Sequence, residues 1–258
     1  MVALLAERPK SPAEGVHFVE NFVGNGTITT NLIGQNMWTL TTIGNAGTLS
    51  YLTTILTDDP PIGGIRSLTG ATADGDGSAV HMLASTARIK GGSRGGGFCF
   101  RYRYPSIAGN VIAANDFRIG LMAGLTATAP TDGISVASEG GVLTLRADSA
   151  DHTDVSQAFA QPLTGRTLTS GTTSVLNVAH QIEVHWEQEN GQGGPLNVYA
   201  YADGILSASL VATNDDDENV TPAIVHWQDQ GGAQSYELDV HFFEYWQFRD
   251  YPDAATLT

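Results

Sequence analysis

Three strongly patterned segments follow one another in the second half of the chain, and their pattern constrains the fold more than any other feature. In residues 181–187, Ile182, Val184 and Trp186 fall on one side of an extended chain, and the polar residues between them fall on the other. Residues 196–201 and 236–242 show the same period of two. Because successive side chains of a β-strand point to opposite faces of the sheet, each segment predicts a strand with one buried and one polar face.

Turn-forming residues separate these segments from a series of others. We expect strands within residues 16–23, 47–56, 79–83, 98–104, 117–123, 134–136, 142–146, 205–211 and 223–227, one more beginning at Trp38, and a tight turn at Gly140 and Gly141. Residues 148–174 are polar and weakly patterned, which predicts a long surface loop. No window shows the spacing of an amphipathic helix. Short strands joined by turns, in a chain with 30 glycines, predict an all-β sandwich or barrel.

The sequence suggests an arm, one domain and a tail. Residues 1–15 contain prolines without a sustained period, and we expect an N-terminal arm there, which Val2, Leu4 and Leu5 could anchor to a neighbouring subunit. No repeat or change of composition divides residues 16–248, which we expect to form one β-sandwich domain. Residues 249–258 are a short polar C-terminal tail.

The charge of the chain excludes two classes of partner. The net charge is −15 and the pI is near 4.6. A nucleic-acid-binding protein needs a basic surface to displace counterions, and an acidic membrane surface would repel this protein, so we expect neither partner. The N-terminus lacks the pattern of a secretory signal, and no stretch approaches the ~20 apolar residues of a membrane span. We therefore expect a soluble protein made in the cytoplasm.

The single cysteine, Cys99, carries little chemistry. It excludes an intrachain disulfide, and its place in the middle of a predicted strand favours an inert side chain over a nucleophile.

The order of strands and aromatic residues along the chain is distinctive. An opening strand near Phe18 precedes Trp38, a later hairpin combines residues 182–186 with residues 198–204 and ends in Asp-Gly, and a closing strand covers residues 237–246. This order resembles the concanavalin A-like lectin/glucanase superfamily, including its laminin-G-like modules. The resemblance implies a jelly-roll sandwich of two antiparallel sheets, with the closing strand beside the first. Because this fold hosts lectins, hydrolases, lyases and virion modules, it does not define a function.

The general character of the chain also resembles the virion proteins of tailed bacteriophages. It is acidic, rich in Gly, Thr and Ala, nearly free of cysteine, and has one predicted β-domain behind an arm. Our leading hypothesis is therefore a non-enzymatic virion protein, a capsid decoration or cement protein that binds the major capsid or another virion protein as a homo-oligomer. Its location would be the virion, assembled in the host cytoplasm. The alternatives are a glycan-binding module or tail-fibre adhesin, and a glycoside hydrolase or lyase.

The segment from Glu183 to Glu187 can be compared with the catalytic strand of the superfamily's glucanases, which carries Glu-x-Asp-x-Glu on one face. Glu183 and Glu187 match the outer positions, and His185 replaces the Asp that tunes their protonation. The two carboxyl groups of a retaining enzyme lie about 5–5.5 Å apart, whereas alternate residues of a strand are about 6.6–7 Å apart along it. Geometry alone does not exclude catalysis, but the missing Asp counts against it, so we assign no catalytic residue.

Polar residues of three predicted strands could line one face of a sheet. They are Arg101, Arg103, Glu183, His185, Glu187, Asp239 and His241. In the fold that the chain resembles, glycans lie on a sheet face and stack on aromatic rings, so this set is a candidate face for a host glycan. The alternative is that these side chains pair across the strands and have only a structural role.

Two acidic loops, residues 74–77 and 215–218, could ligate calcium through their carboxylates. Neither has the spacing of a twelve-residue calcium loop, and the seven histidines show no metal-binding spacing. We therefore assign no metal site and no cofactor, with calcium as the alternative.

Overall fold

The structure is a computed structural model of the 258-residue chain. It describes residues 8, 10, 15–24, 27–28, 33–34, 38–45, 47–52, 63–82, 87–88, 95–105, 111–125, 130–160, 176, 178–188, 195–213, 219–230 and 234–248. The proposed anchoring residues Val2, Leu4 and Leu5, the acidic loop at residues 215–218 and the tail at residues 249–258 lie outside these ranges.

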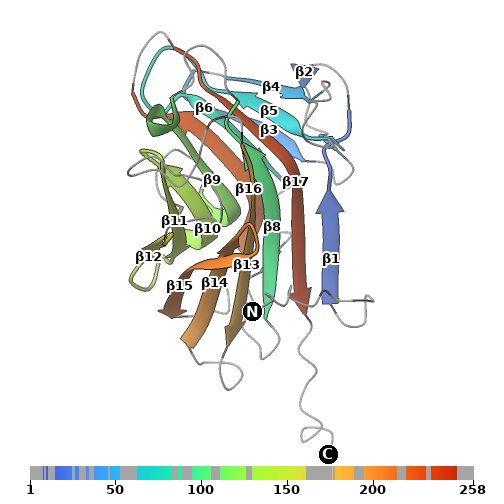
Figure 1. Ribbon diagram of the computed structural model, residues 1–258, viewed down its shortest axis with the longest axis vertical. Helices are drawn as coiled ribbons and strands as arrows, with labels where there is room; N and C mark the ends of the chain where they lie inside the picture. Colours follow the sequence, from blue (N-terminus) through green and yellow to red (C-terminus); the bar gives the residue numbers. More distant parts are fainter. Residues whose placement is uncertain are drawn as a thin grey trace, which may run out of the picture.

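Within these ranges, the strands form two antiparallel sheets, one of nine strands and one of eight (Figure 1). The nine-stranded sheet contains β1 (Gly15–Glu20), β2 (Thr27–Ile28), β4 (Thr48–Tyr51), β5 (Ile65–Leu68), β8 (Gly96–Arg103), β13 (Ala179–Gln188), β14 (Pro195–Ala202), β15 (Ile205–Thr213) and β17 (Glu237–Phe248). The eight-stranded sheet contains β3 (Thr39–Ile43), β6 (Gly77–His81), β7 (Ala87–Arg88), β9 (Asn115–Ala123), β10 (Asp132–Glu139), β11 (Val142–Asp148), β12 (Val155–Ala158) and β16 (Asn219–Gln228). In the described part of the chain the one helix is a 3₁₀ turn at Ile112–Ala114, so no helix there could span a membrane.

Strands that are distant in the sequence are neighbours in both sheets. The nine-stranded sheet has the order β15-β14-β13-β8-β17-β5-β4-β2, with β1 also paired to β17. The eight-stranded sheet has the order β12-β11-β10-β9-β16-β6-β3, with β7 also paired to β16. The closing strand therefore lies beside the first, as Figure 1 shows for β17 and β1. The all-β sandwich of two antiparallel sheets predicted from the sequence is confirmed.

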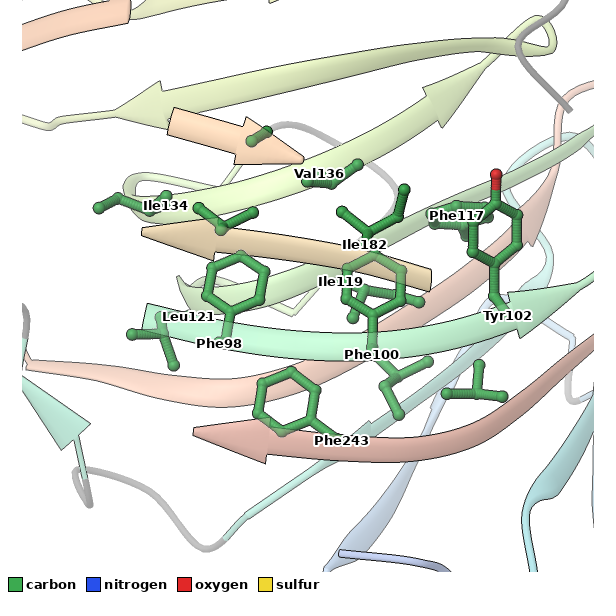
Figure 2. Packing of buried hydrophobic residues seen from close by; sticks show 14 of the residues in the cluster. Phe98, Phe100, Tyr102, Phe117, Ile119, Leu121, Ile134, Val136, Ile182 and Phe243 are labelled. Atoms are coloured by element: carbon green, nitrogen blue, oxygen red, sulfur yellow. The ribbon is translucent and has the colours of Figure 1, made fainter. Parts of the chain in front are cut away.

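The space between the sheets is filled by apolar side chains. Phe98, Phe100 and Tyr102, alternate residues of β8, are fully buried there. Burying one large apolar side chain contributes about 1.5–3 kcal/mol, so the rings of this strand are a major part of the core. Figure 2 shows them beside residues of β9, β10, β13 and β17, namely Phe117, Ile119, Leu121, Ile134, Val136, Ile182 and Phe243.

A buried hydrogen-bonded network also joins the two sheets, and we call it the inner network. Each ring nitrogen of His226 forms a hydrogen bond: Nδ1 lies 2.8 Å from Ser67 Oγ, and Nε2 lies 2.5 Å from Asn115 Oδ1. Ser67 Oγ lies 2.8 Å from Ser78 Oγ, and Asn115 Nδ2 donates to the Glu237 carbonyl at 2.8 Å. Because an amide oxygen only accepts, His226 Nε2 carries the ring proton and Nδ1 accepts from the Ser67 hydroxyl. Burial lowers the pKa of His226 to about 3, so the ring is neutral.

The predicted tight turn joins β10 and β11. Gly140 and Gly141 have φ angles of 59° and 80°, a conformation that residues with a Cβ rarely adopt. The prediction of this turn is confirmed.

The prediction of one long surface loop over residues 148–174 is wrong in its first part, because β12 lies there and pairs with β11. Three of the four β12 residues are exposed, so the segment lacks the apolar alternation that would have predicted a strand. The pairing with β11 defines this edge strand. Residues 161–175 lie outside the described ranges.

Candidate binding site

The outward side of the nine-stranded sheet brings most of the predicted polar residues together. Residues directly opposite each other in an antiparallel pair share a face. Cys99 on β8 is opposite both Glu183 on β13 and Glu244 on β17, and Arg103 is opposite Asp239. We call this surface the polar face. Its residues on the central strands are Cys99, Arg101, Arg103, Glu183, His185, Glu187, Tyr199, Tyr201, Asp239, Glu244 and Trp246.

His241 does not follow this register. Val240 on β17 is opposite Tyr102 on β8, and Phe242 is opposite the neighbouring Arg101. The register therefore shifts between Val240 and Phe242, and His241 is an extra residue in β17. The shift places Phe242 on the polar face, whereas strict alternation predicted it on the apolar side with Leu238 and Val240. A β-bulge of this kind inserts one extra residue into a strand and re-aims the side chains beyond it.

Arg8 lies over the centre of the polar face. Its guanidinium carbon is 3.5 Å from the centroid of the Trp246 ring. Nε donates to Glu244 Oε1 at 2.8 Å, and one terminal nitrogen lies 3.3 Å from Glu244 Oε2 and 3.1 Å from Glu183 Oε1. His185 Nε2 is 2.9 Å from the same Glu183 oxygen, and His17 Nε2 is 2.9 Å from Glu244 Oε1. These six residues, Arg8, His17, Glu183, His185, Glu244 and Trp246, are called the Arg8 cluster.

A glycine provides the space for the indole at the base of this cluster. Gly97 on β8 is opposite both Trp246 and His185. A Cβ at Gly97 would lie 2.2 Å from Trp246 Cζ2, so only glycine lets the indole lie across β8. The His185 ring then meets the Trp246 ring edge-on, with centroids 5.5 Å apart. Trp246 is only 1% exposed although it belongs to the outward face.

Within the Arg8 cluster, Arg8 and its acidic partners favour each other's charged forms. Partial burial acts to raise the pKa of Glu183, but the hydrogen bond from His185 and the positive charge of Arg8 outweigh it and lower that pKa below its ordinary value. Burial acts to lower the pKa of Arg8, but its hydrogen bond and charge interaction with Glu244 raise it. Both groups are therefore ionised at neutral pH.

A second ionic group occupies the other end of the polar face. Asp239 is fully buried and accepts hydrogen bonds from two arginines. Arg66 on β5 donates to it at 2.7 and 3.0 Å, and Arg103 on β8 contacts the same carboxylate. Arg66 also lies 3.0 Å from Glu237. Asp239 and Arg103, which were candidates for glycan contact, are thus engaged in a structural ion pair.

Beyond the Arg8 cluster, the polar face carries two half-buried tyrosines. Tyr199 and Tyr201 lie on β14, on the same face as His185 and Glu187. The Tyr199 hydroxyl lies 3.4 Å from Glu187 Oε1, and the Tyr201 ring meets the His185 ring at 5.3 Å. This is the part of the polar face where partly exposed aromatic rings lie next to hydrogen-bonding groups.

The eight-stranded sheet has a polar group of its own on its outward side. Arg118 on β9 lies over Trp227 on β16, 5.4 Å from the ring centroid, and contacts Glu139. Arg146 donates to Asp148 at 3.0 Å. The sequence analysis singled out none of these residues, although the polar residues alternate with apolar ones within β9 and β11.

Asp116 on β9 is an unusual carboxyl group. Burial raises its pKa to about 7, the negative charges of Asp229 and Glu139 act in the same direction, and the hydrogen bond that it accepts from the Gly140 amide at 2.9 Å opposes them.

One residue of the acidic loop at 74–77, Asp76, has a structural role. Asp76 accepts hydrogen bonds from the backbone amides of Asn45, Ala73 and Thr72, and the first of these contributes most to lowering its pKa. Within the described ranges, no group of three or more His, Cys, Asp or Glu side chains is placed to hold a metal ion. Cys99 is buried, and this burial raises the pKa of its thiol well above the ordinary value, which does not suit a nucleophile.

The two packed sheets, with the first and last strands paired, define a β-sandwich of the jelly-roll class. Several solved structures are similar to this fold. A protein of unknown function from Shewanella oneidensis MR-1 is 13% identical, with a TM-score of 0.54 over 97% of this chain and 94% of that one. The carbohydrate recognition domain of Emp47p is 14% identical, with a TM-score of 0.50 over 93% and 99%. The catalytic domain of an endo-1,3-beta-glucanase from Thermotoga petrophila RKU-1 is 10% identical, with a TM-score of 0.48 over 90% and 97%.

No protein-family model and no curated protein sequence matches the chain. The chain has a concanavalin A-like jelly-roll fold, as the sequence predicted. Sequence identities of this size show a common fold alone, because one fold of this kind carries many functions.

Proposed function

We propose that the protein is a non-catalytic binding module that takes a glycan on the polar face, beside Tyr199 and Tyr201. The proposal needs no metal or cofactor. Sugar rings present apolar faces to aromatic side chains and hydroxyl groups to polar ones, so a binding surface for them combines the two.

The observation that carries this proposal is the position of the two half-buried tyrosines on β14 next to His185 and Glu187. The rings offer stacking surfaces, while the carboxylate accepts and the imidazole can accept or donate hydrogen bonds. The similarity of the fold to the Emp47p carbohydrate recognition domain adds to it.

The state of Glu183 supports a non-catalytic role. A glycosidase needs one carboxylic acid with a raised pKa to protonate the leaving group. Glu183 instead has a lowered pKa and is bonded to both Arg8 and His185. We expect no release of reducing ends when the protein is incubated with β-glucans and other polysaccharides, and such release would contradict a non-catalytic role.

A glycan array tests the binding proposal. We expect the parent protein to bind at least one class of glycan, and Tyr201→Ala and His185→Ala each to weaken that binding about tenfold, the effect of losing roughly 1.4 kcal/mol of contact energy. Val142→Ala on β11 of the other sheet, where the side chain is 37% exposed, is the control and should bind as the parent does. An array without binding by the correctly folded parent would exclude the proposal.

A second candidate function, attachment to a virus particle as a decoration protein, is favoured by the edge strand β1. Within the described ranges β1 pairs with β17 at the side of the sheet. Val16 and Val19 on this strand and Val23 just beyond it are 50%, 40% and 57% exposed. A row of exposed apolar side chains suits contact with another protein, such as a capsid protein.

Mass spectrometry of virus particles from cells that carry the gene tests this second function. The protein should be a component of the purified particles, and the double substitution Val16→Glu and Val19→Glu should remove it from them without unfolding it. Absence of the parent protein from the particles would exclude a decoration role.

A further inference from the structure

The Arg8 cluster has the composition of a receptor for a guanidinium group. We propose that the polar face carries a guanidinium-binding site that Arg8 fills from within the same chain, and that the N-terminal segment of a second copy can fill it in trans. The proposal is independent of the glycan: its ligand is an arginine side chain, and its readout is the binding of a peptide.

The contacts of Arg8 use the features that distinguish guanidinium from ammonium. The planar group lies 3.5 Å from the centroid of the Trp246 ring, so its flat side faces the indole. Its nitrogens approach both oxygens of Glu244 and one oxygen of Glu183. A lysine ammonium has neither a flat surface to stack nor a fork of fixed donors to bridge two carboxylates. The site is therefore selective for arginine.

The strands build this site without help from Arg8. Glu183 and Glu244 both lie opposite Cys99, on the two strands that flank β8, so their Cα atoms are about 10 Å apart across two strand spacings. The small Cys99 side chain between them leaves room for both carboxylates to converge on one cation. His185 and His17 each hold one of these carboxylates.

The floor of the site is fixed in the same way. Gly97 makes room for the indole, and the His185 and Trp246 rings meet edge-on at a centroid distance of 5.5 Å. Arg8 is the one member of the cluster that belongs to no strand of either sheet. The hydrogen-bond acceptors of the site are held by the sheet, whereas the donor, Arg8, belongs to a separate segment. An arginine from the N-terminal segment of a second copy can therefore take the place of Arg8.

The test separates the two halves. A chain that lacks residues 1–14 is mixed with a synthetic peptide of residues 1–14, and binding is followed by calorimetry and by the fluorescence of the tryptophans. We expect the peptide to bind, to bind at least tenfold more weakly with Arg8→Lys, and to lose measurable binding with Arg8→Ala. The full-length chain should bind the parent peptide at least tenfold more weakly than the truncated chain does, because its own Arg8 competes at a high effective concentration.

Two substitutions in the truncated chain locate the binding. Glu244→Gln should abolish peptide binding, and Asp151→Asn, which removes the same charge at an exposed residue of the bend after β11, should leave it unchanged. Circular dichroism confirms that each variant is folded. If truncation prevents folding, the full-length Arg8→Ala variant replaces the truncated chain and should bind the parent peptide at least tenfold more tightly than the parent chain does.

Three outcomes would overturn the proposal. They are absence of peptide binding by a folded chain in which Arg8 is deleted or replaced, equal binding of the parent and Arg8→Ala peptides, and equal binding of the parent peptide by the full-length and truncated chains.

Discussion

The inner network and the Arg8 cluster both join separate parts of the molecule through a histidine and its hydrogen-bond partners, but they do so in opposite electrostatic states. The inner network is neutral, fully buried and joins one sheet to the other. The Arg8 cluster is charged, lies at the surface and joins the N-terminal segment to one sheet.

This difference predicts different consequences of breaking each group. Groups of the inner network have no water to replace a lost partner, so each group left without one costs about 1–3 kcal/mol. In the Arg8 cluster, the side chains of Arg8 and Glu244 are 22% and 16% exposed, and a partly solvated ion pair of this kind contributes about 0–1 kcal/mol. The inner network is therefore suited to fix the sandwich, and the Arg8 cluster to hold a contact that can be exchanged.

The largest effect is expected from His226→Ala. The substitution removes one hydrogen-bond partner each from Asn115 and Ser67 and creates a cavity between the sheets, so we expect a loss of about 3–5 kcal/mol in the free energy of unfolding. Urea denaturation at neutral pH measures it. His152→Ala, at an exposed histidine, is the control and should change the stability by less than about 0.5 kcal/mol. A small loss for His226→Ala would show that the inner network does not hold the sheets together.

The pH dependence of stability sharpens the same contrast, because two buried groups act in opposite directions. The pKa of His226 is about 3 in the folded protein and about 6.5 when unfolded, so the unfolded chain binds the extra proton and stability falls as the pH drops from about 6.5 to 3. The pKa of Asp116 is about 7 in the folded protein and about 3.9 when unfolded, so the folded chain binds the extra proton and stability falls as the pH rises from about 4 to 7.

Between about pH 4.5 and 6.5 the contributions of His226 and Asp116 to the pH dependence of stability offset each other. The substitution Asp116→Asn removes the second contribution, so the effect of His226 should become measurable. We expect the variant to lose stability on acidification more steeply than the parent, by up to about 1.4 kcal/mol per pH unit. Urea denaturation across this range measures the slope, with Asp151→Asn as a control that should leave it unchanged. A slope equal to that of the parent would contradict the assignment of Asp116 as a buried, partly protonated carboxyl group.

The sandwich was predictable because its central strands bury one side and expose the other. Residues such as Ile182, Val184 and Trp186 therefore recur at a period of two, which the sequence displays directly. The edge strand β12 was missed because most of its side chains are exposed, and its pairing with β11 leaves no periodic apolar pattern.

The polar face was predictable only in part. Alternation placed Glu183, His185 and Arg103 on outward sides, and the structure brings them onto one surface. It could not show that a bulge at His241 breaks the alternation of β17, since the inserted residue has no distinctive type. It also could not show that Arg8, 175 residues before Glu183, lies against it, because such contacts depend on the tertiary structure alone.

Gly97→Ala tests the base of the Arg8 cluster. The new Cβ would collide with the Trp246 ring, and we expect a loss of about 1–3 kcal/mol together with a change in tryptophan fluorescence as the indole moves. Gly140→Ala is the control. It adds a methyl group at a residue with a positive φ, but the new Cβ meets no other atom within 4 Å, so this variant has backbone strain without a collision. It should cost about 1 kcal/mol and leave the fluorescence unchanged. Unchanged fluorescence in Gly97→Ala would mean that this glycine does not position Trp246.

The smallest effect on stability is expected from Arg8→Ala, although Arg8 makes more charged contacts than His226. The pairs that Arg8 forms are partly exposed, and His17 and His185 still hold the two carboxylates after its removal, so we expect a loss of about 0.5–1 kcal/mol at low salt and less at high salt. Urea denaturation at both salt concentrations measures it. Arg8→Lys keeps the charge but loses the stacking on Trp246, so it should restore only part of the difference. A loss as large as that of His226→Ala would mean that the N-terminal segment is an integral part of the sandwich, and that the contrast between a permanent inner network and an exchangeable surface contact does not hold.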